Sequence, residues 1–238
     1  MRNTNTDVLI CTDARLTDKA GRRLEKQTKS IMGPFSRVHY TPMSRTSTRR
    51  SAKCPLVGGF FCVINERWGP SLLTCKSDNT NLGILTCLPL RTADGTISIL
   101  GSYWPVPYSE LEESDHPGNF WAQIQSWCHR HDIQKSPIDY VQDLSVAWLN
   151  TELKNGSIGA IYGGDLNATW TADEHGGSYT LGPWAMEHGF INGPVQIAHH
   201  RQERFHTHQS GSWIDHVLRM GPIGNIDILG AHVSTGME

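Results

Sequence analysis

Short runs of apolar residues, separated by polar and turn residues, predict a mixed α/β fold for this chain. The runs predict strands at 6–12, 36–41, 57–65, 71–76, 82–90, 96–104, 158–164, 204–207, 213–220 and 226–232. Helical periodicity is present at 119–131 and 138–154, and a short helix is expected near 181–188. Strands in series, then helices, then strands again favour a mixed domain over an alternating βαβ domain.

Two segments carry the periodicity of amphipathic helices. Within 119–131, Phe120, Ile124 and Cys128 recur at spacings of four and form one apolar stripe. The second segment, 138–154, follows Pro137, and proline is common in the first turn of a helix. We therefore expect helices that flank two packed sheets.

Length and composition agree with one domain of this kind. The 238 residues are enough for a single α/β domain with a sizeable core, and no domain-sized linker interrupts 1–238. No apolar run reaches the roughly 18 residues of a membrane span, and the polar start at 1–7 predicts no signal peptide. Six cysteines without a Cys-x-x-Cys pair favour reduced thiols in an intracellular protein, nuclear or cytoplasmic, that is neither secreted nor membrane-bound.

The net charge of −2 means that local basic patches would have to hold any nucleic-acid partner. One candidate patch is 43–53, which is rich in Ser, Thr and Arg and contains no acidic residue. Its cations are Arg45, Arg49, Arg50 and Lys53, and each can neutralise one backbone phosphate without reading sequence. A flexible, solvated loop between two strands is the other interpretation of this segment.

The turn after the strand at 158–164 is the most informative local feature. The strand ends in Gly163-Gly164, and Asp165-Leu166-Asn167 follows. The glycines permit unusual φ angles and let a substrate backbone come close. An acceptor-only carboxylate beside an amide that donates and accepts suits a site for phosphate, metal and water. An ordinary Asx turn explains the same residues equally well.

Three further segments accompany this turn in a fixed order. They are Asp7-Val8-Leu9-Ile10-Cys11-Thr12-Asp13 near the start, Gly101-Ser102-Tyr103-Trp104-Pro105 before the turn, and Ser212-Trp213-Ile214-Asp215 after it. In that order and at those spacings, the segments resemble the endonuclease/exonuclease/phosphatase superfamily with its DNase I-like fold. The resemblance is closest to the apurinic-endonuclease-like domains of non-LTR retrotransposons, and it extends from residue 7 to residue 238.

The resemblance implies a fold and an activity. The implied fold is a four-layer α-β-β-α sandwich of two mixed sheets, forming a single domain over 1–238. The implied activity is hydrolysis of phosphodiesters with Mg²⁺ or Mn²⁺, as the DNA-nicking endonuclease domain of a mobile element. The implied partner is nucleic acid, DNA in the first place, and a reverse transcriptase domain could accompany it on the parent polypeptide.

The resemblance also assigns a role to each matching position. Asp13 stands where the family has a metal-binding glutamate, and Tyr103 stands where a tyrosine donates to the phosphate. Asp165 is expected to orient the attacking water, and Asn167 to steady the water or the phosphate. Asp215 would orient a closing histidine by accepting from its ring N–H.

Three departures from the family pattern change the expectation. The family's first strand, with an asparagine near the metal, has no counterpart; Asp13 is one methylene shorter than the glutamate; and no closing Ser-Asp-His follows 228–238. A Ser114-Asp115-His116 does occur, but its loop position favours capping of the next helix. We therefore expect an incomplete domain that cleaves DNA weakly or not at all.

Two classes of function remain open on these residues. The Asp165–Asn167 turn and Asp215 favour a metal-dependent phosphodiesterase. The missing ends favour a non-catalytic nuclease-like domain that binds nucleic acid, and a phosphodiesterase or phosphatase for a small substrate is a third interpretation. Abasic DNA, a defined DNA sequence, RNA and a small phosphodiester all stay open as substrates, because a fold does not fix function.

Overall fold

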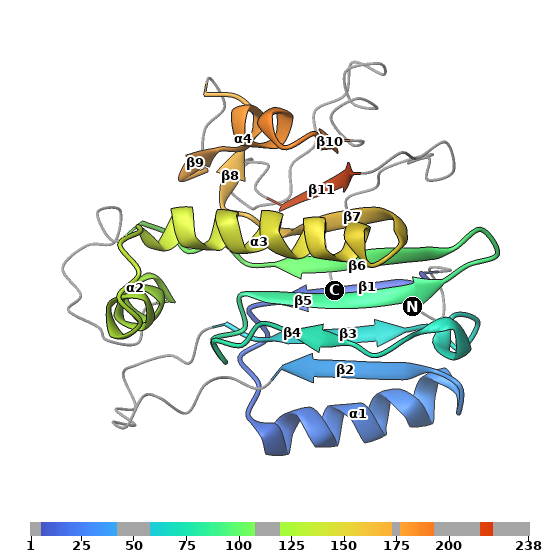
Figure 1. The fold of residues 1–238 in the computed structure, drawn as a ribbon. Helices are drawn as coiled ribbons and strands as arrows, with labels where there is room; N and C mark the ends of the chain where they lie inside the picture. The colour runs from blue at the N-terminus through green and yellow to red at the C-terminus, as the bar shows by residue number, and fades with distance from the viewer. Residues whose placement is uncertain (1–5, 42–57, 108–119, 173–176, 193–214, 221–238) are drawn as a thin grey trace.

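Two β-sheets form the centre of the computed structural model, which describes residues 6–41, 58–107, 120–172, 177–192 and 215–220 (Figure 1). The smaller sheet is antiparallel, in the order β1-β3-β2, with β1 (Val8–Thr12), β2 (Arg37–Thr41) and β3 (Phe60–Ile64). The larger sheet has the order β10-β11-β7-β6-β5-β4. Its strands are β4 (Lys76–Ser77), β5 (Leu85–Arg91), β6 (Thr96–Ser102), β7 (Ser157–Asp165), β10 (Ile191–Asn192) and β11 (Asp215–Met220).

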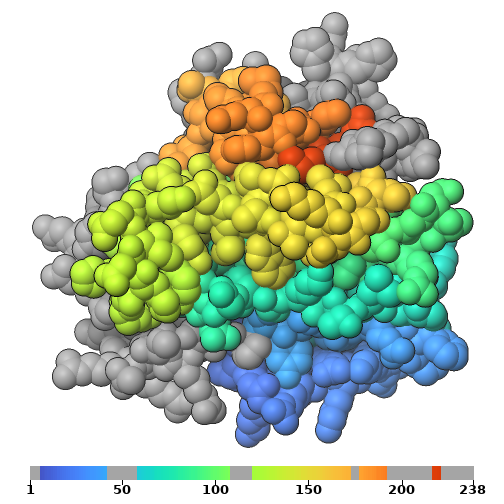
Figure 2. All heavy atoms as spheres, viewed as in Figure 1, coloured from blue at the N-terminus to red at the C-terminus, as the bar shows by residue number. Residues whose placement is uncertain are grey.

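Helices pack on both sheets. The helix α1 (Asp18–Met32) packs against β2, and α3 (Pro137–Lys154) packs against β7. Beside α3 lies α2 (Phe120–Arg130), and in Figure 2 the side chains of these two helices form a continuous layer over this face. The helix α4 (Leu181–Glu187) follows two short parallel strands, β8 (Ala168–Thr169) and β9 (Tyr179–Thr180). The predicted α-β-β-α fold class is confirmed.

Alternation of side chains along the larger sheet builds two cores. On β5, Leu88 and Leu90 face the smaller sheet and pack with residues such as Phe60. Leu85 and Cys87 point to the opposite face and pack beneath the helices. Successive residues of a strand point to opposite faces, so one strand contributes to both cores. This arrangement fixes the two sheets face to face.

The sequence pattern missed α1, because few apolar residues interrupt its polar surface. The helix comes close to β2 at Gly21, where an added Cβ would lie 2.4 Å from the Tyr40 ring. Its ends nevertheless carry recognisable signals. The Thr17 hydroxyl accepts from the Ala20 N–H at the start, and Gly33, with φ +102°, follows the last turn.

The strand predicted at 71–76 is wrong. A short 3₁₀ turn occupies Gly69–Ser71, Leu72 forms an isolated bridge to Leu90, and Lys76–Ser77 alone forms a strand of the sheet, β4. The Pro89 carbonyl accepts from Leu73 N–H at this edge of β5, so the missing N–H of Pro89 faces the same edge. A continuous ladder is therefore interrupted there. The strands predicted at 204–207 and 226–232 lie outside the described residues.

Two further expectations concern thiols and membranes. The five cysteines that the structure describes are free, and Cys62, Cys87 and Cys128 are buried. Burial raises the pKa of the Cys87 thiol to about 12, so this group stays a neutral core residue. Within the described ranges, no helix combines the length and the apolar character needed to cross a lipid bilayer.

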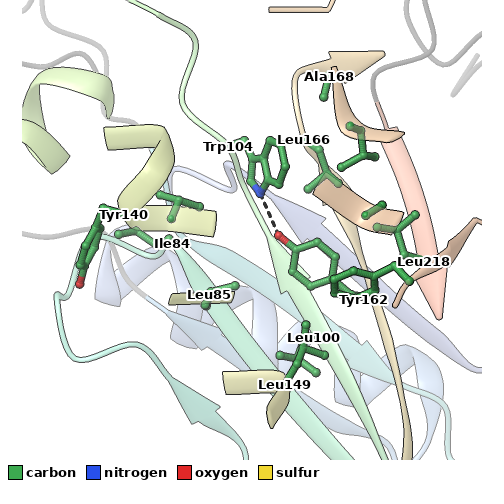
Figure 3. Packing of buried hydrophobic residues seen from close by; sticks show 14 of the residues in the cluster. Ile84, Leu85, Leu100, Trp104, Tyr140, Leu149, Tyr162, Leu166, Ala168 and Leu218 are labelled. Carbon is green, nitrogen blue, oxygen red and sulfur yellow. Dashed lines mark hydrogen bonds between the residues drawn. The ribbon is translucent and has the colours of Figure 1, made fainter. Parts of the chain in front are cut away.

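A chain of buried hydrogen bonds joins α3 to the residues that follow β6, and Figure 3 shows its link between Trp104 and Tyr162. The Ser145 hydroxyl donates to the Val141 carbonyl (2.7 Å), so its oxygen accepts from the Tyr162 hydroxyl (3.1 Å). The Tyr162 oxygen accepts in turn from the Trp104 indole N–H (2.8 Å). Trp104 and Tyr162 are fully buried, so the indole N–H of Trp104 depends on the Tyr162 oxygen as its acceptor.

Tyr162→Phe should test this chain of hydrogen bonds. The substitution leaves the buried Trp104 indole N–H without an acceptor, which should lower the free energy of unfolding by about 1–3 kcal/mol. Urea unfolding measures the change. Tyr40→Phe is the matched control, because the Tyr40 hydroxyl donates to Asp18 at an exposed position. Equal effects of the two substitutions would contradict the structural role given to Tyr162.

Candidate active site

Three strand ends meet at one edge of the sandwich. The parallel strands β6 and β7 end side by side, at Ser102 and Asp165, and β1 of the other sheet ends at Thr12. Gly164 lies where they meet. A Cβ added to Gly164 would lie 2.0 Å from the Ser102 carbonyl oxygen and 3.0 Å from the Thr12 methyl carbon. Only glycine permits this close approach, which brings the residues after each strand together.

The two glycines before the turn make room for neighbouring strands, whereas the sequence pattern predicted that they would make room for a substrate. Gly164 has φ +145°, so the predicted unusual backbone is confirmed. The expected approach of a substrate backbone is not what fills the space, because the Ser102 carbonyl and the Thr12 methyl lie there. At Gly163, a Cβ would lie 2.5 Å from the His216 carbonyl, so this glycine lets β11 approach β7.

The turn that follows β7 is an Asx turn, and it is tied to the end of β6. The Asp165 Oδ1 accepts from the Asn167 N–H (3.2 Å). The Asn167 amide donates to the Trp104 carbonyl (2.7 Å), and the Trp104 N–H donates to the Asp165 carbonyl (3.0 Å). Asn167 has φ +46°, which is uncommon for a non-glycine residue. The turn therefore holds the carboxylate and the amide in fixed positions.

Tyr103 lies at the centre of these groups. Its ring packs against Phe120, with the ring centroids 4.9 Å apart. Burial raises the pKa of Tyr103 most, and the nearby Asp13 and Asp165 carboxylates raise it further. The Arg15 charge and a hydrogen bond from the Asn167 side chain lower this pKa by smaller amounts. The hydroxyl therefore stays protonated and can donate a hydrogen bond.

Asp13 and Arg15 form a rigid pair directly after β1. The Asp13 Oδ2 accepts from the Arg15 Nε (2.8 Å) and Nη2 (2.5 Å), and Oδ1 accepts from the Gly58 N–H (2.6 Å). The Arg15 N–H donates to the Gly58 carbonyl (3.1 Å). Both residues have positive φ, +48° and +50°, at a cost of roughly 1–3 kcal/mol each. Sequence reasoning missed Arg15; the Asp-x-Arg spacing after a strand was the available signal.

Asp215 begins β11 and is paired in register with Asp165. Directly opposed residues of antiparallel strands have Cα atoms about 4.5–5.5 Å apart. The backbone therefore places Asp215 beside the turn; its side chain lies outside the described part. The next residue, His216, is buried, and its Nε2–H donates to the Ala168 carbonyl (2.7 Å). The catalytic role of Asp215 stays a prediction.

The predicted phosphate-contacting cations all lie outside the described residues. They are Arg45, Arg49, Arg50 and Lys53. The Ser114-Asp115-His116 sequence is likewise outside. The structure thus brings Asn167 within hydrogen-bond reach of Tyr103 and of the Trp104 carbonyl, and it places Asp13 and Asp165 near enough for their charges to raise the pKa of Tyr103. Their catalytic roles remain predictions.

The described side chains at this edge do not provide the ligand set of a preformed metal centre. Within the described ranges, no three His, Cys, Asp or Glu side chains group in a way that could hold a metal ion. A carboxylate offers about four lone-pair positions. Asp13 uses three, for the Gly58 N–H and the two guanidinium donors of Arg15. These residues therefore do not form a ready metal centre, and the metal role of Asp13 stays a prediction.

Comparison with known proteins shows similarity of fold rather than of sequence. No family model matches the sequence, and no curated protein sequence matches it. The 3′-5′ exonuclease NExo from Neisseria meningitidis superposes with a TM-score of 0.59 at 10% identity, covering 92% of this chain and 78% of that one. The same values describe a variant of the 3′ phosphatase NExo from Neisseria, bound to a product DNA hairpin.

At 10% identity, this likeness shows the fold and nothing finer. It confirms the DNase I-like sandwich that the sequence motifs implied. The closer relation to retrotransposon domains has no such support and is a proposal. The chain is thus a DNase I-like α/β sandwich with a polar site at the ends of β1, β6 and β7.

Gly164→Ala should disrupt this meeting of strand ends. The new methyl group collides with the Ser102 carbonyl and forces a strained φ, so we expect the free energy of unfolding to fall by roughly 3 kcal/mol or more. Gly189→Ala is the matched control, because Gly189 has φ +73° but no atom within 4 Å of an added Cβ. It should cost about 1 kcal/mol from strain alone. Equal losses in urea unfolding would contradict the role of Gly164.

Proposed function

We propose that this chain hydrolyses phosphodiesters of nucleic acid, as the DNA-nicking endonuclease domain of a mobile element. The observation that carries the proposal is the grouping of Asp13, Asp165 and Asn167 around one protonated tyrosine, Tyr103. Carboxylates can orient water, while a hydroxyl and an amide can donate to a phosphate. The site therefore offers both kinds of group that attack on a phosphodiester requires.

Each residue has a task in this proposal. Asp165 orients the attacking water through its carboxylate, which the Asn167 N–H holds in place. Tyr103 donates its hydroxyl hydrogen bond to a non-bridging phosphate oxygen, since its raised pKa keeps the proton on the ring oxygen. Asn167 steadies the water or the phosphate. Asp215, whose backbone pairs with Asp165, is the residue that would orient a closing histidine by accepting from its ring N–H.

The proposed activity includes a divalent cation, Mg²⁺ or Mn²⁺. Mg²⁺ is usually held by one or two carboxylates together with substrate phosphates and water. Asp13 would hold it through the one lone-pair position that Gly58 and Arg15 leave open. The cation would neutralise charge on the phosphate. DNA phosphates farther along the backbone would be contacted by the cations of 43–53, which are Arg45, Arg49, Arg50 and Lys53. The protein in this proposal is nuclear or cytoplasmic, and a reverse transcriptase domain could accompany the chain.

Processing of DNA 3′ ends is the second candidate. The structures similar to this chain are named a 3′-5′ exonuclease and a 3′ phosphatase bound to a DNA hairpin. Those activities belong to those proteins, but they favour a phosphate ester of DNA as the substrate class. A nick within a duplex and a cleaved 3′ end are distinguished by the products formed.

Asp165→Asn should reduce cleavage to the background rate. Positioned acid–base groups contribute about 10²–10⁴-fold, so a slow wild-type reaction should fall below detection. The assay follows nicking of a supercoiled plasmid and release of phosphate from a 3′-phosphorylated oligonucleotide. Both reactions contain Mg²⁺ or Mn²⁺ and a high concentration of protein.

Asp143→Asn is the control, because Asp143 is an exposed carboxylate on α3 that pairs with Lys135. It should cleave as the wild type does. Cleavage that survives Asp165→Asn would show that the site lies elsewhere. Binding of DNA without cleavage of either substrate would favour the non-catalytic function instead.

A further inference from the structure

Arg15 is the positive charge that the proposed function leaves without a task. Its side chain is 50% exposed, whereas that of its partner Asp13 is only 16% exposed. Within the described part of the chain, Asp13 is the only side chain that the guanidinium contacts. A guanidinium has five N–H donors, so three remain available for a ligand.

The position of this guanidinium is fixed from both ends. The backbone of Arg15 donates to Gly58, and the preceding Ala14 N–H donates to the Gly59 carbonyl (3.0 Å). The side chain is held through Nε and one Nη2 hydrogen by Asp13, whose other oxygen accepts from Gly58. Neither the backbone nor the side chain is free to swing, so the remaining donors point in a set direction.

Stability does not explain this arrangement. Ion pairs with an exposed partner contribute little, and positive φ at two non-glycine positions of one loop, Asp13 and Arg15, opposes folding. A similar pair lies at the other end of β1, where Arg67 contacts Asp7. Neither of those residues has a positive φ. The strain is thus specific to the end of β1 where the three strands meet.

The groups around Arg15 define what it can bind. The Tyr103 hydroxyl is a donor on which the Arg15 charge acts. The Asn167 amide already donates to the Trp104 carbonyl and to the tyrosine oxygen, so it holds this hydroxyl in place. The remaining guanidinium donors and the Tyr103 hydroxyl together suit a tetrahedral oxyanion, and the planar fork of arginine matches two phosphate oxygens. The neighbouring carboxylate of Asp13 is already paired, so it repels such an anion less.

We propose that Arg15 binds a phosphate group of the substrate directly and that Asp13 is the positioning residue that aims it. The ligand is a phosphate oxyanion, either an internal diester or a terminal phosphate. This inference rests on the proposed function for the nature of the substrate. It adds that Asp13 acts by positioning Arg15, and that the phosphate group binds without a divalent cation.

The test is binding of a short fluorescein-labelled DNA duplex in EDTA, measured by anisotropy, with inorganic phosphate as the competitor. Arg15→Gln should weaken binding about 10- to 100-fold, as expected for lost charge-assisted hydrogen bonds. It should also reduce the log–log salt slope by about 0.9. Arg15→Lys should recover part of the affinity, because lysine keeps the charge without the fork.

Asp13→Asn separates positioning from simple electrostatics. Removal of a negative charge would by itself strengthen binding of an anion, whereas loss of the group that aims Arg15 should weaken it. We expect weaker binding, and stronger binding would overturn the positioning role. Arg67→Gln is the matched control, since it removes the exposed pair at the other end of β1 and should leave affinity unchanged.

The two competitor results distinguish the source of the phosphate. A raised inhibition constant for inorganic phosphate in Arg15→Gln assigns a terminal phosphate, and an unchanged constant with weaker DNA binding assigns an internal diester. Binding by Arg15→Gln equal to that of the wild type or of Arg67→Gln would overturn the inference.

The Asp165→Asn variant separates this inference from the proposed function. This variant should bind DNA in EDTA, and it should fail to cleave DNA when Mg²⁺ or Mn²⁺ is present. If Asp165→Asn still cleaves, the function fails while the Arg15 result stands. If Asp165→Asn abolishes cleavage but Arg15→Gln binds normally, only the inference fails.

Discussion

The absence of a side chain at Gly164 is the constraint on which the site depends. Two strands of one sheet and one strand of the other end within contact of this residue, because the Ser102 carbonyl and the Thr12 methyl occupy the place of a Cβ. The residue that follows each strand is then a polar one: Asp13 after β1 and Tyr103 after β6, with Asp165 ending β7. The packing of the two sheets thus creates the site directly.

The charges at this edge are balanced by direct contacts. Asp13 is paired with Arg15, and the Asp165 carboxylate is held by the backbone N–H of Asn167. Tyr103 is kept neutral by burial and by both carboxylates. The result is an edge with fixed hydrogen-bond donors and a held carboxylate; in the proposed function the donors bind an anion and the carboxylate orients water. Behind it, Trp104 connects the turn to the buried Tyr162.

Much of this arrangement could be predicted from the sequence, and the exceptions have physical causes. Asp165, Asn167 and Tyr103 were found because each lies at the end of a clear apolar strand. The sequence predicted a strand at 213–220, but the register that pairs Asp215 with Asp165 comes from the structure. Arg15 was missed because its importance comes from a backbone conformation, a positive φ, that residue types do not reveal. Likewise, α1 was missed because a glycine contact, not an apolar stripe, brings it against its sheet.

The central claim is that the meeting strand ends form a phosphate site, and a crystal structure with a bound DNA oligonucleotide tests it most directly. The measurement is the distance from each protein donor to the nearest phosphate oxygen. We predict one phosphate within hydrogen-bond distance, roughly 2.7–3.2 Å, of the Arg15 guanidinium and the Tyr103 hydroxyl, beside Asp165. DNA bound at another surface, with Arg15 and Tyr103 contacting only protein, would contradict the account.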